Sequence, residues 1–580
     1  MKRQLTLTGA PLVAMALLAP SPASASLASP TPLAHDYRGL YGGQARAQNR
    51  LSDVLVGIEN AKRLPPSPSA TSAAASHAVT VDVLDRHGRP PKTADAEYVY
   101  FRSLDGKEDV YGDLKDGHFT GRLAPGEYIV LTGVYTAEPD GAKSLSVVYL
   151  SRVVFDRDRS LVLDARKARP ISVKVDRPDA RLVGGEGGGA VARIVQTIGG
   201  EVERVGEMLV TDDDPVHVTP SGPAPGLKLL VQGRLTKNGA VMDSPYIYNV
   251  AGSVSGKDII PADPTLRVRT ADLAEVKTNY ARQGRPACAG THAGAILSGG
   301  GFNTGFFAGI GALPATRTEY FSPKFDWETD AGIGPGDCEF DEMISTNSGV
   351  ENFPRAGVHT RDRTTGPFGP GPDYNYLLND GTFRLMVPMF TSWHLPEGLA
   401  PADRTTLQDA TGKVIGTSDE AGWGEFRLPP GRGTYKLTAD AHHQVAWSDL
   451  STRQHAVWTF TAQPPAADEP ADVPLLIVRH RVRLDDDNGA PRGSQTIDLE
   501  GRAGNGKPNP AIRELALQVS YDDGATWANA PVSRTPDGWR ATVRNPKGSK
   551  ARHVSLRTIA EDTTGRTVDQ TVIHAYALHD

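Results

Sequence analysis

Beyond about residue 77, apolar and polar residues alternate over short runs, and this pattern predicts a chain built from β-strands. Residues 79–83 and 171–175 alternate in this way. A period of two places every second side chain on the same face of a strand. Unbroken apolar runs at residues 98–101 and 147–150 predict strands that are buried on both faces. Turn residues, as at 85–88, separate the runs at short intervals, so the sequence predicts an all-β fold of tandem β-sandwich domains.

One stretch of the sequence occurs twice in modified form. Residues 116–128 and 423–435 each run from a strand through a Pro-Gly turn into a second strand. Phe119 and its counterpart Phe426 are expected to face a core, and Tyr128 is expected to return into the sandwich after the turn. The pattern resembles the prealbumin-like repeats of carboxypeptidase regulatory-like and collagen-adhesin B-type modules. That resemblance implies an architectural role.

The length of 580 residues is too great for a single core and predicts four or five domains at roughly 100 to 150 residues each. Residues 276–380 are rich in Gly and Pro, which predicts long loops there, and a Pro-rich segment at 464–470 predicts a linker. The expected domains are a prealbumin-like sandwich at 77–168, a sandwich at 169–275, a loop-rich β domain at 276–395, a prealbumin-like sandwich at 396–463 and an immunoglobulin-like or fibronectin-like sandwich at 471–580.

The N-terminal residues predict export. A basic start, an apolar run at 10–19 and the small residues Ala23 and Ala25 fit a secretory signal peptide at residues 1–25. Residues 26–76 are rich in Ala, Pro and Ser and predict a low-complexity linker, in which 49–63 has the apolar spacing of one short helix. No later run approaches the roughly 20 apolar residues of a membrane helix. We therefore expect a secreted, extracellular protein without a transmembrane segment.

The charge of the chain limits the classes of partner that it is expected to bind, and its cysteine content predicts one disulfide. The chain has 62 basic and 68 acidic residues, a net charge of -6, which favours neither nucleic acid nor an anionic membrane as a partner. Its two cysteines, Cys288 and Cys338, are expected to form a disulfide in an oxidising environment. Such a bridge closes a loop of about fifty residues and contributes about 2–4 kcal/mol.

The last predicted domain contains the spacing of an Asp box: Ser520, Asp522, Gly524, Thr526 and Trp527. In this hairpin the Asp side chain caps the turn, Gly takes a positive φ, and Trp packs beneath. Sialidase propellers carry several such boxes away from their catalytic residues, whereas this sequence has one. The motif therefore predicts a structural hairpin.

Two short stretches resemble motifs of subtilisin-like peptidases without completing them. Residues 290–294 resemble the His-Gly-Thr-His motif, but Ala289 occupies the position of the catalytic histidine. Residues 416–418 resemble the nucleophile motif, but Asp419 and Glu420 follow where the family has small or apolar residues, so Ser418 is expected in a hairpin turn. Without a base and an orienting acid the triad cannot be assembled, and no catalytic residue or cofactor is predicted.

Three further groups of side chains have both a structural and a functional interpretation. Acidic clusters at 212–214 and 485–489 suit solvated turns better than calcium sites, because they lack the spacing of an EF-hand loop. His442, His443 and His455 are expected to be surface or core histidines more than metal ligands. Trp327 lies in an irregular aromatic segment, where core packing is favoured and an exposed platform for a sugar is the alternative.

The order of several segments resembles the C-terminal accessory β-domains of large secreted actinomycete subtilases. These segments are 317–322, 450–460 and 473–479, together with the Asp box, 554–557 and 571–576. In that family a peptidase domain precedes the β modules, whereas here a signal peptide and linker are expected to lead into them. The resemblance implies an accessory architecture, and none of the family's catalytic residues can be transferred.

These observations favour a secreted, non-enzymatic β protein that binds a protein, a peptide or a cell-wall ligand. Two alternatives stay open at this stage. One is a carbohydrate-binding protein that uses Trp327. The other is a cryptic hydrolase whose residues converge around the bridge between Cys288 and Cys338.

Overall fold

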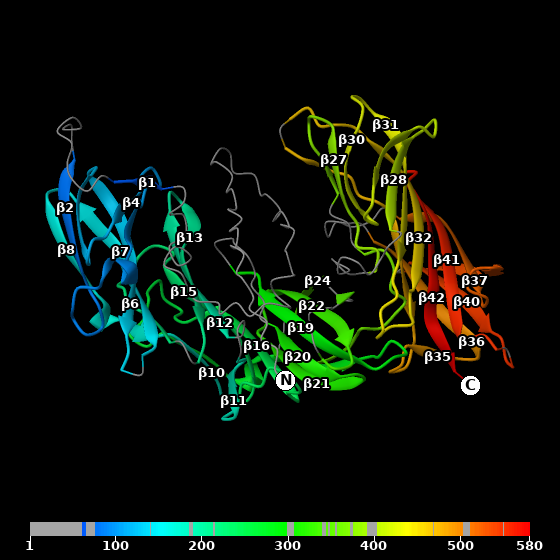
Figure 1. Ribbon diagram of the computed structural model, residues 1–580, viewed down its shortest axis with the longest axis horizontal. Helices are drawn as coiled ribbons and strands as arrows, with labels where there is room; N and C mark the ends of the chain where they lie inside the picture. The colour runs from blue at the N-terminus through cyan, green and yellow to red at the C-terminus, as the bar shows by residue number, and fades with distance from the viewer. Residues whose placement is uncertain are drawn as a thin grey trace, which may run out of the picture. The chain divides into compact units, whose positions relative to one another are not determined.

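The computed structural model describes residues 61–64, 76–139, 141–184, 189–212, 215–297, 307–338, 344–345, 349–353, 357–371, 375–390, 403–467, 469–502, 511–536, 538–548 and 550–579. In this part of the chain every regular element is a β-strand except three short 3-10 turns, at Thr93–Asp95, Ala165–Lys167 and Thr270–Asp272 (Figure 1). The prediction of an all-β fold is confirmed. The expected signal peptide at 1–25 lies outside the described residues. Among those residues no helix is long and apolar enough to cross a bilayer.

Two sheets of the N-terminal part enclose an apolar core. Their strand orders are β5-β2-β8 and β1-β4-β3-β6-β7-β14-β9. Val81 of β2 is fully buried and the neighbouring Asp82 is exposed, as expected for a strand with one solvated face. The bounds are β1 Lys62–Arg63, β2 His77–Leu84, β3 Tyr98–Ser103, β4 Asp109–Asp113, β5 His118–Leu123, β6 Gly126–Ala137, β7 Lys143–Phe155, β8 Arg159–Asp164, β9 Arg169–Pro170 and β14 Val216–Val218.

The middle of the chain forms a large sheet, a smaller sheet and one isolated strand pair. The large sheet is ordered β13-β12-β15-β16-β21-β18-β25 with β11 beside β15, the smaller one is β20-β19-β22-β23 with β24 beside β22, and β10 pairs with β17. The bounds are β10 Ser172–Val175, β11 Ala180–Leu182, β12 Ala190–Ile198, β13 Glu201–Val210, β15 Lys228–Lys237, β16 Tyr246–Ser253, β17 Thr265–Val268, β18 Ala274–Tyr280, β19 Ala287–Ala295, β20 Ala308–Ala312, β21 Ala315–Phe321, β22 Asp326–Pro335, β23 Ile344–Ser345, β24 Gly349–Asn352 and β25 Gly357–Arg363.

The C-terminal part contains a nine-stranded sheet that positions the candidate site. Its order is β29-β28-β31-β32-β42-β41-β37-β38, with β35 beside β42, and two four-stranded sheets are ordered β30-β27-β26-β33 and β34-β36-β40-β39. The bounds are β26 Tyr376–Leu377, β27 Thr382–Met386, β28 Arg404–Asp409, β29 Val414–Ser418, β30 Trp423–Arg427, β31 Gly433–His442, β32 Arg453–Ala462, β33 Ala471–Asp472, β34 Ile477–Val482, β35 Gly489–Pro491, β36 Gly493–Arg502, β37 Ile512–Ser520, β38 Ala528–Ala530, β39 Val532–Thr535, β40 Gly538–Asn545, β41 His553–Asp562 and β42 Thr567–His579.

The sheets do not follow all of the domain limits expected from the sequence. The limit between residues 275 and 276 falls inside β18, and β26 and β27, from the expected loop-rich domain, share a sheet with β30. Strand β32 pairs antiparallel with β42, so the two expected C-terminal domains share one continuous sheet (Figure 1). The expected helix at 49–63 is wrong at its end, where Lys62–Arg63 pairs as β1 with β4, and residues 51–60 are not among those described.

Both copies of the sequence repeat fold as strand, turn and strand. Phe119 of β5 is 2 % exposed and Phe426 of β30 is 4 % exposed, so both face a core. Each ring lies against a glycine of its own copy: a Cβ added at Gly121 would come within 2.6 Å of the Phe119 ring, and one added at Gly424 within 2.8 Å of the Phe426 ring. Gly112 of β4 also lies against the Phe119 ring, because a Cβ there would come within 2.2 Å of it. The glycines of the repeat therefore make room for the aromatic ring.

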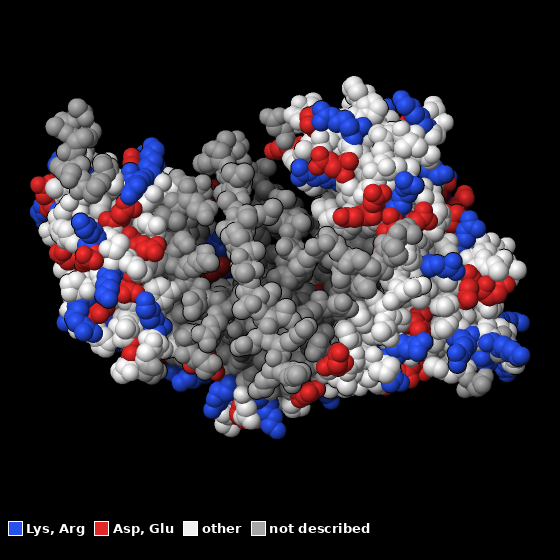
Figure 2. Space-filling model, viewed as in Figure 1, with Lys and Arg blue, Asp and Glu red and all other residues white. Residues whose placement is uncertain are grey.

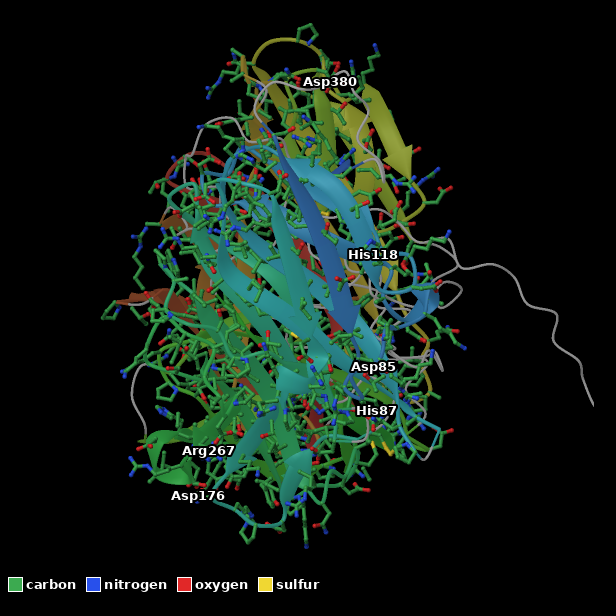
Figure 3. All side chains as sticks on the ribbon, turned by 90° about the vertical axis from the view of Figure 1, so that its left-hand side faces the viewer. Asp85, His87, His118, Asp176, Arg267 and Asp380 are labelled. Carbon is green, nitrogen blue, oxygen red and sulfur yellow. A yellow bond between two sulfur atoms is a disulfide. The ribbon has the colours of Figure 1, made fainter. Side chains whose placement is uncertain are left out.

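Aspartates in the turns next to strands cap these turns by accepting backbone hydrogen bonds. Asp85, which follows β2, accepts from the backbone N–H of His87 at 2.8 Å, and both residues lie at one end of that strand (Figure 3). Asp380 accepts from Thr382 N at 2.9 Å in the corresponding way before β27. These carboxylates satisfy donors that the strands leave unpaired, and we assign them to the architecture.

Candidate ligand-binding groove

The Asp-box hairpin connects β37 to β38 and forms one wall of the candidate site. Asp522 accepts hydrogen bonds from the Thr526 backbone N–H at 2.8 Å and from its hydroxyl at 2.6 Å, and these bonds lower the Asp522 pKa to about 2. Gly524 has a φ of +88° and donates its N–H to the Ser520 hydroxyl at 2.9 Å. A Cβ at Gly524 would lie 3.3 Å from the Trp527 ring, so the indole packs against this turn.

An open groove of about 610 Å³ lies beside this hairpin, on the solvent-facing side of the nine-stranded sheet. Its volume is within the range of roughly 300–1,000 Å³ that is usual for small-molecule sites. The residues that bear on its chemistry are Trp527 of the hairpin, Arg453 and His455 of β32, Thr571 of β42, and Arg557 of β41. The groove therefore joins residues from both of the domains expected in the C-terminal part.

Four polar side chains of the groove form one row across four neighbouring strands. Asp440 pairs with His455, His455 with Thr571, and Thr571 with Arg557 in the strand registers. Directly paired residues of antiparallel strands point to the same side of a sheet, at an interstrand spacing of about 4.8 Å. The alternate residues, such as Trp458, which is 0 % exposed, face the core on the other side.

One ion pair and one hydrogen-bonding contact hold polar side chains of the groove in place. Arg557 binds Asp569 through two hydrogen bonds, of 2.9 Å from Nε and 2.6 Å from Nη2, and this contact raises the pKa of Arg557. His455 Nδ1 lies 2.6 Å from an Asp440 carboxylate oxygen. Side chains fixed in this way keep donors and acceptors oriented before a ligand arrives, which reduces the entropy lost on binding.

The wall of the groove is tied to the sheet by a second histidine. His574 of β42 has its Nε2 at 2.8 Å from Asp523 of the Asp-box turn, and its ring stacks on His553 with centroids 4.1 Å apart. Arg453 donates to the Asp523 carbonyl oxygen at 3.3 Å. These contacts set the position of the hairpin, and with it Trp527, relative to the row of polar side chains.

Trp327 does not form the exposed sugar platform considered from the sequence. Strand β22 begins at Asp326 and directs Trp327 into the core, where it is 1 % exposed and packs edge-on against Phe321. Its indole N–H donates to the Ser322 carbonyl oxygen at 3.1 Å. The aromatic segment that suggested an exposed surface thus joins the end of β21 to the start of β22, and the sugar-platform alternative is wrong for this residue.

The predicted disulfide is present, and its surroundings are packed. Cys288 of β19 bonds to Cys338, with 5.2 Å between their Cα atoms. Ala289, at the position of the peptidase histidine, is 0 % exposed. His292 of the same strand is also buried, and burial together with the charge of Arg234 lowers its pKa to about 3. A buried ring of this kind is not placed to meet a substrate, so these residues give no support to a hydrolase.

The other side chains singled out in the sequence have structural contacts. Ser418 ends β29 and accepts a hydrogen bond from the Glu420 N–H at 3.2 Å. His443 is buried, with Nε2 at 2.9 Å from the Leu450 carbonyl oxygen. Asp485 accepts from the Gly489 N–H at 2.8 Å, as expected of a capped turn. No group of three or more potential metal-ligating side chains occurs among the described residues.

A buried ionic network between the two middle sheets was not expected from the sequence. Glu319 of β21 binds Arg317 at 2.8 Å and Arg361 of β25, and it accepts the Tyr280 hydroxyl at 2.5 Å. Burial opposes the charge of Glu319, but the two arginines outweigh it and lower its pKa to about 2. These residues lie on the neighbouring strands β21, β18 and β25 of the large sheet, and the pairing of these strands brings them together.

No protein-family model and no curated protein matches this chain. Among solved structures, the human desmocollin-1 ectodomain is 11% identical, with 87% of this chain and 98% of that chain covered and a TM-score of 0.12. The Bacillus anthracis TIE protein is 11% identical, with 64% and 70% covered and a TM-score of 0.12. These likenesses are too slight to inform fold or function, and the β architecture is therefore argued from the chain itself.

Proposed function

We propose that this chain is a secreted, non-catalytic binding protein and that the groove beside the Asp box is its binding surface. The observation that carries the proposal is the convergence of Trp527, Arg453, His455 and Arg557 from a hairpin and two strands on one open groove. Pre-oriented polar groups beside an aromatic ring are typical of sites that recognise a ligand. The disulfide and the signal peptide expected at residues 1–25 support an extracellular location.

The order of segments that resembles subtilase C-terminal regions supports an accessory role, in which the protein attaches to a surface or polymer near a peptidase. The distribution of charged side chains does not favour nucleic acid as the partner. Among the described residues on the face shown in Figure 2, acidic and basic side chains are interspersed, without an extended field of one sign. The partner we propose is therefore a cell-wall component, a protein or a peptide that is held by directed contacts.

The proposal is tested by sedimentation of the secreted chain with purified bacterial cell walls, with insoluble polysaccharides and on immobilised protein. We expect retention on at least one of these materials, and a loss of retention in Arg557→Ala. Arg481→Ala is a matched control, because Arg481 is an exposed arginine of β34 that is paired with Glu500 at 3.1 Å outside the groove. Absence of retention on all three materials would overturn the proposed function, and equal retention of both variants would exclude the groove.

A further inference from the structure

We infer that the groove binds a neutral polysaccharide, an inference that rests on the proposed function and specifies its ligand. The groove carries charges of both signs. The carboxylates of Asp440 and Asp569 are engaged by His455 and Arg557, and Arg453 lies against the Asp523 carbonyl oxygen. Carboxylates of Asp440, Asp523 and Asp569 and guanidinium groups of Arg453 and Arg557 line the groove side by side, so a highly charged polymer of either sign would meet repulsion as well as attraction.

The strands beneath the groove already pair with a neighbouring strand on both sides. Strand β32 pairs with β31 and β42, and β42 pairs with β41 on its other side. A peptide that binds a sheet by strand addition needs an open edge, and these central strands offer none. A ligand over this surface must therefore be recognised by side chains alone, which favours a polymer that carries its own hydrogen-bonding groups along its length.

The polar side chains of the groove suit a glycan in both kind and spacing. The row of Asp440, His455, Thr571 and Arg557 presents carboxylate, imidazole, hydroxyl and guanidinium groups at successive strand steps of about 4.8 Å. Neighbouring sugar hydroxyls act as both donors and acceptors, and this row supplies both kinds of partner. One strand step is close to the length of a pyranose unit, so a glycan that lies across the strands would meet a polar group at each sugar.

The aromatic wall completes the match with a sugar ring. Trp527 is partly exposed at the groove and packs against Gly524, which leaves indole surface next to the polar row. The apolar C–H face of a pyranose packs on such a surface, while its hydroxyls turn toward the polar groups. Ile573, also in the groove, extends the apolar part beside the hairpin.

The inference is tested by affinity electrophoresis of the secreted chain in gels that contain dextran, mannan, xylan or arabinogalactan, beside gels with the anionic polymers hyaluronate and heparin. We expect retardation by at least one neutral polymer that persists at 0.5 M salt, because no counterions are displaced when a neutral ligand binds. Thr571→Val, which removes one hydroxyl without a change of shape, should weaken retardation roughly five- to tenfold. Trp527→Ala should weaken it at least as much, and Arg481→Ala should leave it unchanged.

The outcomes separate this inference from the proposed function. Retardation only by anionic polymers, with loss in high salt, would overturn the neutral-glycan assignment while the groove remains a binding site. If only immobilised protein retains the chain and Arg557→Ala abolishes that retention, the neutral-glycan assignment is also wrong, while the groove remains a binding site. Binding of neutral polymers that is unaffected by Thr571→Val and Trp527→Ala would place the glycan site elsewhere. If no material retains the chain, both the inference and the proposed function fail.

Discussion

His480 of β34 should make the C-terminal part less stable at mildly acidic pH than at neutral pH. Its side chain is buried, and its Nε2 lies 2.7 Å from the Thr558 hydroxyl on β41. Burial lowers the pKa of His480 to about 4. An unfolded histidine titrates near 6.5, so the unfolded chain takes up this proton first as the pH falls. The stabilisation is therefore complete above about pH 6.5 and is lost as the pH falls toward 4.

The size of the effect follows from the difference between the two pKa values. With titration near 6.5 in the unfolded chain and about 4 in the folded one, acidification from pH 7 to pH 5 removes about 2 kcal/mol from the free energy of unfolding. This is a large fraction of the roughly 5–15 kcal/mol by which a domain is usually stable. Other buried histidines, such as His443, whose pKa burial lowers to about 4, add to the total loss.

The contribution of His480 alone is isolated by comparison with His480→Gln, which removes the titrating group. The free energy of unfolding of both proteins is measured at pH 7 and pH 5 by urea denaturation, with hydrogen exchange of β36 amides to follow the sheet that contains β34. We expect the advantage of the wild type over the variant to shrink by about 2 kcal/mol between the two pH values. A constant difference between the proteins would refute this reasoning, as would an NMR titration that shows His480 protonated at pH 6.

Three further predictions concern the architecture. Replacement of Cys288 and Cys338 by serine removes a crosslink between residues 50 positions apart and should lower the free energy of unfolding of that region by up to about 4 kcal/mol. A urea midpoint of the wild type that does not change when reductant is added would contradict this. Gly112→Ala should cost about 1–3 kcal/mol by crowding the ring of Phe119, with partial recovery when Phe119→Leu is added, and thermal unfolding measures both. Asn488 has a φ of +57° and three side-chain hydrogen bonds to the backbone, so Asn488→Ala should destabilise more than Asn488→Gly in urea; the reverse order would exclude the strain.

The candidate site shows why local sequence patterns were not sufficient to find it. The Asp box and the pair His442 and His455 were each visible in the sequence, about 70 residues apart, and each alone had a structural explanation. They lie in one groove because β32 pairs with β42 in the register that sets Arg453 opposite Ile573. Alternation along a strand fixes which side chains share a face, but it does not state which two strands are neighbours.

The sequence by itself determined the β architecture, the repeat built around Phe119 and Phe426, and the disulfide, because each depends on short-range periodicity, on a Pro-Gly turn between two strands, or on a cysteine count of two. Only the tertiary structure decided that Trp327 is buried, that two expected domains share one sheet, and that polar groups form a row across it. The shared sheet and the polar row depend on the pairing of β32 with β42, whose partner residues lie more than 100 positions apart, and the burial of Trp327 depends on the pairing of β22 with β19 and β24. The energy of such pairing comes from surfaces that meet after folding, and no local pattern encodes it.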